Sequence, residues 1–429
     1  LGLFENPYVS EDTVLDVFET QAQRLLAREI ALQSMVLLKN DGLLPLPKAG
    51  TIAVIGPNAD ASRHMLGDYS YASMVELMTY QPMPSSAFIA GVDQEYMQKH
   101  AAQVPSTLEA IRTFLGQEAQ VLYSPGCQVA GQDLSGLPEA VQVASQADVV
   151  ILVLGDKSGL TPDCTTGETR DRAELGLPGV QEELVKSLVA VGKPVVAVLI
   201  NGRPVSSPWL DEHVSAILEA WLPGEEGGAA IAQVLFGDYN PGGRLPVSLA
   251  RSVGQVPISY NHKPSGAYSN WYGNYVDMPV TPLYPFGHGL SYTSFCYSDM
   301  QLSRKTVQSG EQVDISLTVT NTGQLAGDEV VQLYVSDEIA SIPRPVKELK
   351  GFYRLHLEPG QSRRLTFHLP ADLLAYYDEN LDLILERGKI HIMLGSSSVD
   401  IHLQDEFEII GCDKATVAQR LFSYPVTIH

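Results

Sequence analysis

The amino-terminal half of the chain alternates between short apolar runs and segments with a helical period. The apolar runs that we expect to be strands are Ile52 to Gly56, Gln120 to Tyr123, Val149 to Gly155, Pro194 to Asn201 and Ala216 to Trp221. The helical patterns between them are Ser106 to Leu115, Glu139 to Ser145, Gly179 to Val191 and Gly227 to Phe236. Strands that are apolar at consecutive positions need helices on both faces of their sheet. The pattern therefore predicts a doubly wound α/β sandwich.

The residues before the first of these strands have a helical pattern of their own. From Val14 to Leu38 apolar positions recur at spacings of three and four, with neither proline nor glycine among them. This pattern predicts one long helix that ends before Gly42. We assign residues 1–50 to a leading segment with this helix, and residues 51–250 to the α/β domain.

The second half of the chain changes character twice. Residues 251–298 hold five prolines, and nine aromatic residues lie between Tyr260 and Phe295, with no helical period. So many aromatic side chains are costly to leave in water, which indicates an ordered connector. Residues 299–411 show period-two alternation, as at Val313, Ile315 and Leu317, which predicts a small β-sandwich. Residues 412–429 form a tail without an assignment.

The composition is that of a folded protein with a strongly acidic balance. Hydrophobic residues make up 45% of the 429 positions, and 50 Asp and Glu residues outnumber 28 Lys and Arg residues, giving a formal net charge of −22. Such a charge repels polyanions, so we expect neither nucleic acid nor an anionic membrane surface as a partner. The longest strongly apolar run, Val149 to Gly155, is far shorter than the roughly 20 residues that span a bilayer.

Motifs for metals and nucleotide cofactors do not stand out. The four cysteines are widely spaced and are expected to be free thiols, and the ten histidines show no close ligand spacing. No phosphate-binding glycine motif follows a strand. We therefore expect no metal and no cofactor.

In a doubly wound sheet, functional groups belong on loops beyond the carboxyl ends of the strands. One such loop, residues 156–177, interleaves the acidic residues Asp156, Asp163, Glu168, Asp171 and Glu174 with Lys157, Arg170 and Arg172. A carboxylic acid that donates a proton near neutral pH needs burial or a like-charged neighbour. Glu168 lies between Gly167 and Thr169, so its backbone can approach a ligand. The simpler interpretation from these residues alone is a solvated loop in which Asp171 and Arg172 pair.

Two further segments carry groups that suit sugar binding or proton transfer. The loop after the first strand, residues 57–73, contains GDYSYAS, whose hydroxyl groups and aromatic rings suit a sugar, although turns often have this composition. His288, in YPFGHGLSYTSF, has the chemistry of a proton carrier. Its aromatic neighbours favour a packing role.

Several segments together resemble glycoside hydrolase family 3, which includes β-glucosidases and β-xylosidases. They are LGLFENPY, SMVLLKNDGLLPL, IAVIGPNAD, TTGETRDRAELGLPG, LPGEEGGAAIAQVLFGDYNPGGRLPVSL, PLYPFGHGLSYTSF, VVQLYVSD and RPVKELKGF. The resemblance implies a (β/α)8 barrel followed by an α/β sandwich and a fibronectin type III-like β-sandwich. LGLFENPY is similar to the segment just after the barrel. We therefore expect this chain, which starts with Leu1, to match the later part of such an enzyme without its barrel.

The resemblance also implies a division of catalytic groups. Members of the family take a nucleophilic Asp from an SDW-like motif in the barrel, whereas here Ser-Asp pairs occur only at Ser298-Asp299 and Ser336-Asp337. No nucleophile is therefore assigned. The acid/base of the family lies on a loop of the second domain, a position that GETRDR gives to Glu168, with Asp163 and Glu174 as alternatives.

The resemblance further implies a substrate contact at Ser70, together with Asp68 and Tyr71. The function expected is part of a retaining exo-β-glycosidase that releases terminal β-D-glucosyl residues. The alternatives are a β-xylosidase of the same family and a non-catalytic carbohydrate-binding or scaffold protein. The partners expected are a β-linked oligosaccharide or glycoside, the barrel portion as a separate or cleaved chain, and a second copy in a homo-oligomer.

Overall fold

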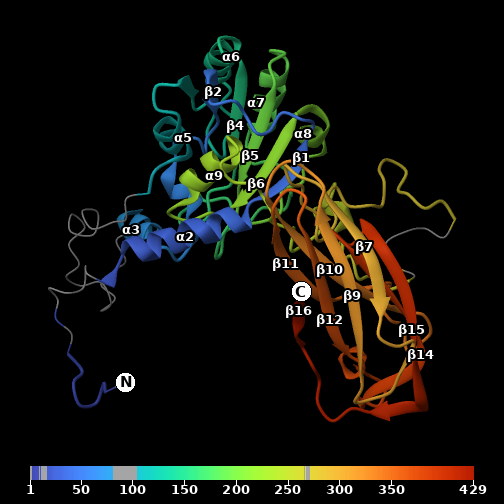
Figure 1. Ribbon diagram of the computed structural model, residues 1–429. Coiled ribbons are helices and arrows are strands. Elements are labelled where there is room, and N and C mark those ends of the chain that lie inside the picture. Colours follow the sequence, from blue (N-terminus) through green and yellow to red (C-terminus); the bar gives the residue numbers. More distant parts are fainter. Residues whose placement is uncertain (1, 9, 11–16, 81–103, 265, 267–270) are drawn as a thin grey trace. The chain divides into compact units, whose positions relative to one another are not determined.

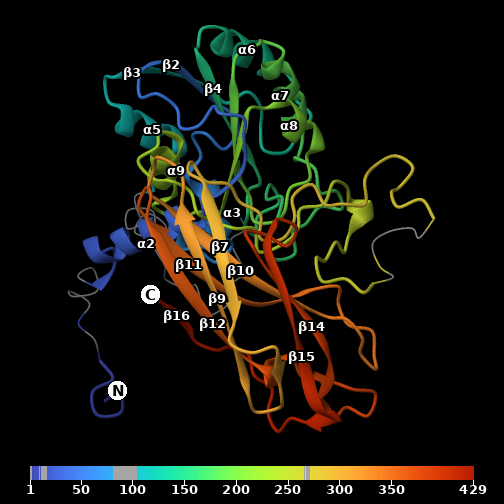
Figure 2. The same ribbon diagram turned by 45° about the vertical axis from the view of Figure 1, so that its right-hand side comes forward.

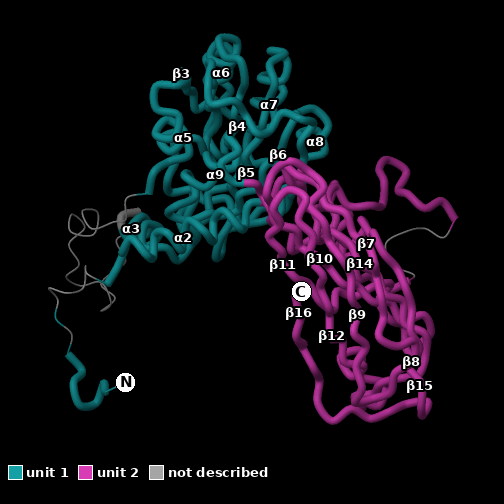
Figure 3. The backbone as a smooth tube through the Cα atoms, in the orientation of Figure 1, with its two compact units in different colours: residues 1–35, 39–239 teal, residues 36–38, 240–429 magenta. Residues whose placement is uncertain are grey.

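The computed structural model describes residues 2–8, 10, 17–80, 104–264, 266 and 271–429 (Figure 1). The chain divides into two compact units, residues 1–35 with 39–239 and residues 36–38 with 240–429 (Figure 3). In the described part of the chain, no helix is both long enough and apolar enough to cross a membrane.

The first unit is built on a six-stranded sheet with the order β1-β6-β5-β4-β2-β3. Its strands are β1 (Val36–Asn40), β2 (Gly50–Ile55), β3 (Ala119–Ser124), β4 (Val149–Gly155), β5 (Val195–Ile200) and β6 (Ala216–Trp221). The pairs β2–β3, β2–β4, β4–β5 and β5–β6 are all parallel. Every residue of β4 is buried, as a strand covered on both faces requires. The predicted α/β sandwich is confirmed.

The helices of this unit form two groups, one on either side of the sheet (Figure 2). One group contains α2 (Gln21–Ser34), α5 (Thr107–Leu115) and α9 (Gly227–Leu235), with α9 in contact with the other two. The second contains α6 (Leu137–Ser145), α7 (Gln181–Val189) and α8 (Pro208–His213), with α7 in contact with the other two. Helix α3 (Tyr71–Tyr80) and the 3-10 helix η2 (Ser62–Met65) follow β2.

The long helix predicted from Val14 to Leu38 is wrong at its carboxyl end. Helix α2 begins after Thr20, whose side chain forms a capping box with Gln23, and it ends at Ser34. Residues 36–40 form strand β1 instead, while residues 14–16 lie outside the described residues. The run Val36, Leu37 and Leu38 is at most 2% exposed. Periodicity cannot distinguish such a short apolar run from a buried turn of helix.

The second unit is a β-sandwich. One sheet has the order β11-β10-β14-β15-β8, with β13 paired to β14, and the other has the order β16-β12-β9-β7. The strands are β7 (Phe295–Leu302), β8 (Thr306–Val307), β9 (Gln312–Asn321), β10 (Gly327–Asp337), β11 (Glu348–Leu357), β12 (Ser362–Pro370), β13 (Tyr376–Tyr377), β14 (Leu383–Gly395), β15 (Ile401–Thr416) and β16 (Val426–Ile428). The 3-10 helix η4 (Ala371–Leu374) precedes β13.

The core of the sandwich comes from alternate positions of its strands. In β9 the side chains of Val313, Ile315, Leu317 and Val319 are fully buried and belong to one apolar cluster. The period-two pattern seen in the sequence is therefore confirmed. Two segments of the expected tail take part in the sheets, because β15 extends to Thr416 and β16 pairs with β12.

The proline- and aromatic-rich residues that we expected to form a connector group with the second unit, and residues 265 and 267–270 among them lie outside the described residues. The 3-10 helix η3 (Val253–Gln255) lies in this segment. The His288 ring stacks on Tyr284, with centroids 5.1 Å apart, and its Nε2 lies 2.9 Å from the Leu38 carbonyl oxygen. These contacts support a packing role for His288.

Candidate active site

The candidate site lies where the strand order of the parallel sheet reverses. The chain passes from β2 to β3 on one side, returns across β2 to β4, and then continues through β5 and β6 on the other side. The switch point is thus between β2 and β4, and ligands of doubly wound sheets bind beyond the carboxyl ends at such a point. The loops that follow β2 and β4 carry Asp68 and Glu168, respectively.

Glu168 occupies the tip of a tight turn. The Arg170 N–H donates to the Gly167 carbonyl oxygen at 3.1 Å, so Glu168 and Thr169 are the two central residues. Thr169 has a φ of 63°, as the third position of a type II turn requires. Gly167 has a φ of 133°, and a Cβ there would lie 2.4 Å from the Gly159 carbonyl oxygen. Only glycine suits this position, and the turn holds an exposed Glu168 at the edge of the sheet.

The loop after β2 is hydrogen-bonded directly to this turn. The Glu168 N–H donates to Asp68 Oδ2 at 2.7 Å, and the Ser158 hydroxyl donates to Asp68 Oδ1. The Tyr69 hydroxyl donates to Glu168 Oε2, and this hydrogen bond raises the pKa of Tyr69 above its usual value. The structure therefore brings Asp68 and Glu168 together. Sequence reasoning missed Tyr69, although it lies inside the aromatic GDYSYAS segment.

Ser70 and Tyr71 have a different placement. The Ser70 hydroxyl donates to the Gly67 carbonyl oxygen at 2.8 Å and accepts from the Ser73 N–H at 3.3 Å, so it stabilises the turn before α3. Tyr71 is the first residue of α3 and is 47% exposed. Among the hydrogen bonds of the described residues, none joins Ser70 to Glu168.

The two alternative acids have other surroundings. Asp163 Oδ2 lies 2.5 Å from Lys157 Nζ, and its Oδ1 accepts from the Thr161 hydroxyl at 2.6 Å. Partial burial raises the pKa of Asp163, but these hydrogen bonds outweigh the effect and hold its pKa below the usual value. Asp163 is thus held as a carboxylate. Glu174 is exposed, and its carbonyl oxygen accepts a hydrogen bond from Arg203.

The charges of the loop do not pair as the simpler interpretation expected. Asp171 forms its ion pair with Arg203, at 2.5 Å, rather than with the guanidinium of Arg172. The Arg172 guanidinium lies 3.4 Å from the buried Asp156 and donates to the Gly176 carbonyl oxygen at 2.9 Å. The loop is therefore tied to the ends of the strands rather than loosely solvated.

A group of charged side chains next to the site connects the segments that carry it. The Arg63 guanidinium donates to Glu76 Oε2 at 2.9 Å, to the Ser73 hydroxyl at 2.6 Å and to the Ser158 carbonyl oxygen at 2.7 Å. Lys157 also pairs with Glu76. The two cations thus join η2, α3 and the loop after β4. Neither Arg63 nor Glu76 was identified from the sequence, since each is a single charged residue without a motif around it.

Deeper in the unit, buried polar groups lie at the ends of β4, β5 and β6. Glu219 is fully buried, accepts from the Trp221 N–H at 2.9 Å and lies 3.3 Å from Asn201 Nδ2. Burial raises the pKa of Glu219 to about 8, and burial also raises the pKa of Asp156. The Asn58 amide reaches three carbonyl oxygens, those of Leu154, Asp156 and Ile200, at 3.1 to 3.4 Å. These groups fix the strand ends from which the loops emerge.

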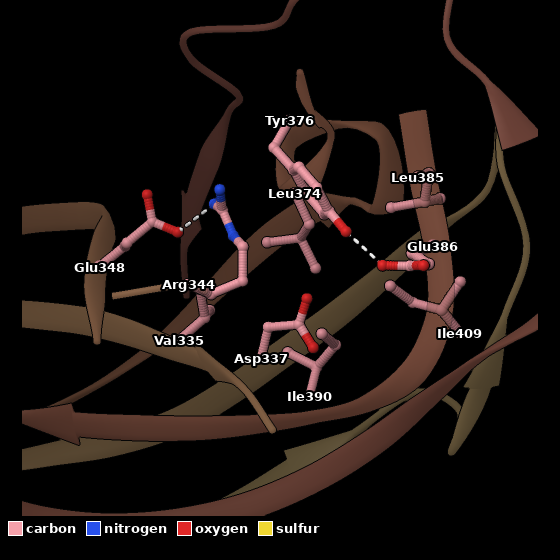
Figure 4. Close-up of a pocket in the computed structure, with 10 residues that line it drawn as sticks. All are labelled: Val335, Asp337, Arg344, Glu348, Leu374, Tyr376, Leu385, Glu386, Ile390 and Ile409. Carbon is pink, nitrogen blue, oxygen red and sulfur yellow. Dashed lines mark hydrogen bonds and ion pairs between the residues drawn. The ribbon is translucent and has the colours of Figure 1, made fainter. Parts of the chain in front are cut away.

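A second polar cluster lies inside the sandwich (Figure 4). Arg344 donates to Glu348 at 2.8 Å and its guanidinium lies 4.4 Å from the centre of the Tyr376 ring, whose hydroxyl donates to Glu386. Burial raises the pKa of Asp337, which points into the same space, to about 6. The cavity between them is about 10 Å³, room for one water at most. This cluster is too tight for a sugar.

The described residues contain no group of His, Cys, Asp or Glu side chains that could hold a metal ion. The candidate site contains the carboxylates of Asp68 and Glu168 and the hydroxyl groups of Tyr69 and Ser158. These groups can transfer protons and bind hydroxyl groups of a ligand.

Comparison with known proteins places this arrangement in a family. Residues 35–292 match the glycosyl hydrolase family 3 C-terminal domain, and residues 329–398 match a fibronectin type III-like domain. A periplasmic β-glucosidase from Salmonella typhimurium is 38% identical, with 96% of this chain and 54% of that protein covered. A β-xylosidase from Formosa agariphila is 39% identical, with 93% and 52% covered.

Solved structures agree with this assignment. A β-glucosidase from Erythrobacter marinus is 37% identical with a TM-score of 0.80, and the match covers 95% of this chain and 53% of that one. A β-glucosidase from Listeria innocua in complex with isofagomine is 32% identical with a TM-score of 0.81, and the match covers 96% and 54%. The chain spans about half the length of these relatives. It belongs to glycosyl hydrolase family 3, of which it carries the C-terminal α/β domain and the fibronectin type III-like domain.

Proposed function

We propose that this chain supplies the general acid/base of a retaining exo-β-glycosidase that releases terminal β-D-glucosyl residues. The observation that carries the proposal is the exposed position of Glu168, on a turn at the switch point of the sheet. A loop carboxyl that meets solvent beyond the strand ends can reach the glycosidic oxygen of a bound substrate.

The reaction needs two carboxyl groups with different roles. A carboxylate from the barrel portion attacks the anomeric carbon while Glu168 protonates the leaving oxygen, which gives a glycosyl-enzyme and a free alcohol. Glu168 then takes a proton from water as that water attacks the same carbon, which releases the sugar and restores both carboxyl groups. Tyr69 fixes the direction of the Glu168 carboxyl through its hydrogen bond.

The neighbouring residues of the loop after β2 serve the substrate and the turn. Asp68 acts as a positioning residue, because it accepts the Glu168 N–H and the Ser158 hydroxyl. Tyr71 presents an exposed ring at the start of α3, which suits stacking on a sugar. Ser70 is proposed as a substrate contact on the family resemblance, with its hydroxyl turned from Gly67 to the sugar on binding.

Helix α2 has an exposed apolar surface on which the proposed barrel portion could pack. Leu25 and Leu26 are each 57% exposed and Ile30 is 60% exposed, on a helix whose other face packs on α9. Apolar side chains at this spacing form a stripe that in a folded protein is normally covered. The relatives are about twice as long as this chain, which supplies a candidate for the covering part.

Complementation with a matching barrel portion tests the proposal. Glu168→Gln in the assembled enzyme should lower kcat on alkyl β-glucosides by about 10²- to 10⁴-fold, and should lower it far less on dinitrophenyl β-glucoside, whose leaving group needs little protonation. Glu174→Gln tests the alternative acid of the same loop, and Glu118→Gln, at an exposed glutamate just before β3, is the matched control. Full activity of Glu168→Gln on alkyl β-glucosides would remove Glu168 from this role.

The nature of the sugar has a specific alternative. The similarity to the Formosa agariphila β-xylosidase favours xylose as the second candidate, and the ratio of kcat/KM for aryl β-xyloside and aryl β-glucoside decides between the two. A non-catalytic role is tested by calorimetry. An assembled protein with no activity on either glycoside, together with sugar binding by this chain alone, would support carbohydrate binding without catalysis.

A further inference from the structure

The second unit contains a cavity that none of the candidate active-site residues lines. Its volume is about 220 Å³. Its walls come from three places: residues 248, 258–260, 262, 280–282 and 285, residues 346–347 before β11, and residues 398–399 between β14 and β15. All the residues that line it lie in the described part of the chain.

Most of the cavity wall is apolar and firmly held. Ile258, Val280 and Pro282 contribute aliphatic surface, and Tyr260 contributes a ring. The Tyr260 ring stacks on Phe286 with centroids 4.3 Å apart, and its hydroxyl accepts the Leu349 N–H at 3.1 Å. Against this part of the wall an aromatic ring leaves no polar group of its own unpaired. Polar side chains also line the cavity, namely Ser248, Ser259, His262 and Thr281. The cavity is open to solvent on one side, where Val399 is 65% exposed, and its volume leaves room for a substituted ring.

Two polar groups at one side of the cavity have unused capacity. Lys347 Nζ donates to the Ser398 carbonyl oxygen at 2.6 Å and takes part in none of the ion pairs found among the described residues. Ser398 is 2% exposed, and its hydroxyl has no hydrogen-bond partner within the described structure. An ammonium without a carboxylate and a buried hydroxyl without a partner together suit an anionic oxygen pair.

We infer that this cavity binds a small aromatic carboxylate, with one carboxylate oxygen on Lys347, the other on Ser398 and the ring against Tyr260 and the aliphatic wall. Burial lowers the pKa of Lys347, and an anion beside the amine would act in the opposite direction and raise that pKa. The inference does not depend on the proposed glycosidase activity, because every group it uses lies in the second unit.

Isothermal titration of the 429-residue chain with benzoate, benzamide and acetate tests the inference. Benzoate should bind one to one with a Kd below about 1 mM, benzamide about tenfold more weakly because it lacks the charge, and acetate not measurably because it lacks the ring. Lys347→Met should weaken benzoate about tenfold and leave benzamide unchanged. Ser398→Ala should weaken benzoate about threefold.

Lys389→Met is the matched control, because this exposed lysine pairs with Glu406 and does not line the cavity. Its benzoate affinity should equal that of the wild type. If Lys347→Met fails to fold, Ser398→Ala and the preference of the wild type for benzoate over benzamide decide the question. The inference is overturned if benzoate shows no saturation up to about 10 mM, if benzamide binds as well as benzoate, or if Lys347→Met binds benzoate as the control does.

Discussion

Strands β4 and β9 have similar apolar residues but bury them in different ways. All seven residues of β4 are buried, because the parallel sheet has helices on both faces. In β9 the buried Ile315 and Leu317 alternate with the half-buried Ser316 and Thr318, because the antiparallel sheet packs on the core with one face only. The spacing of apolar residues, rather than their number, thus separates a doubly covered strand from a singly covered one.

This difference also decides where chemistry can gather. In the α/β unit the parallel strands end at one edge, so the loops after β2 and β4 meet there and bring Asp68 to Glu168. In the sandwich, antiparallel strands send successive loops to opposite ends, and the cluster around Asp337 and Arg344 is enclosed in a small cavity. The first unit leaves the Glu168 carboxyl exposed at this edge, and the second unit packs its carboxyl groups against one another and against Arg344.

The largest effects on stability are expected from truncating buried side chains within the two strands. Leu152→Ala in β4 and Leu317→Ala in β9 should each lower the free energy of unfolding by about 2–5 kcal/mol. The adjacent positions should show the difference between the two strands. Val153→Ala should lower the free energy of unfolding by about 1–3 kcal/mol, because Val153 is buried as well, whereas Thr318→Ala should lower it by only about 0.5 kcal/mol. Chemical denaturation measures all four variants. An equal cost for Val153→Ala and Thr318→Ala would contradict the difference in burial.

The next effect concerns two turns. Gly167→Ala should cost about 1–3 kcal/mol in unfolding free energy, because its φ of 133° suits only glycine and the new Cβ would meet the Gly159 carbonyl oxygen and Asp68. It should also lower kcat of the complemented enzyme, since the turn carries Glu168. Gly360→Ala in the sandwich, with a φ of 76° and open space around it, should cost only about 1 kcal/mol and leave kcat unchanged. If Gly167→Ala and Gly360→Ala lowered kcat equally, the turn at Gly167 would have no specific role in the active site.

A smaller effect concerns the buried carboxyl of the α/β unit. Burial raises the pKa of Glu219 from 4.5 to about 8, so the folded chain holds this proton more tightly than the unfolded chain. The resulting stabilisation is complete below about pH 4.5 and is lost as the pH rises through about 8. Between pH 7 and 9 the unfolding free energy of the wild type should fall by about 1 kcal/mol more than that of Glu219→Gln. Parallel curves for the two proteins over this range would show that Glu219 does not titrate there.

The smallest effect is expected from the corresponding group of the sandwich. The pKa of Asp337 is raised by burial from 3.8 to about 6, against the opposing effect of Arg344, while Glu386 and Glu348 raise it further. Its protonated form stabilises the fold fully below about pH 3.8, and that contribution is lost as the pH rises through about 6. Because the group is partly solvated, wild type should lose only about 0.5 kcal/mol relative to Asp337→Asn between pH 5 and 7. Chemical denaturation at pH 5 and pH 7 measures this difference in unfolding free energy. If Asp337→Asn lost more stability than the wild type over this range, the expected pKa shift would have the wrong direction.

Much of the fold could be predicted because its signals are local. Runs of apolar residues such as Val149–Gly155 and the alternation around Val313 and Leu317 each state how many faces a strand buries. The same reasoning failed at residues 36–38, where a short apolar run satisfies either period and only the neighbouring strand decides. The charges of the loop after β4 were visible, but the choice of Arg203 over Arg172 as partner of Asp171 was not.

The sequence by itself determined that the chain has an α/β sandwich and a β-sandwich, which family it resembles, and which loop carries Glu168. Each of these depends on residues close together in the chain. Only the tertiary structure decided that Asp68, one hundred positions away, accepts the Glu168 N–H, that Tyr69 holds its carboxyl, and that Lys347 and Ser398 share one cavity wall. Such contacts follow from the order in which strands pair and from the packing of distant segments. Hydrogen bonds form between whichever groups the finished fold brings within about 3 Å, and no local pattern records that choice.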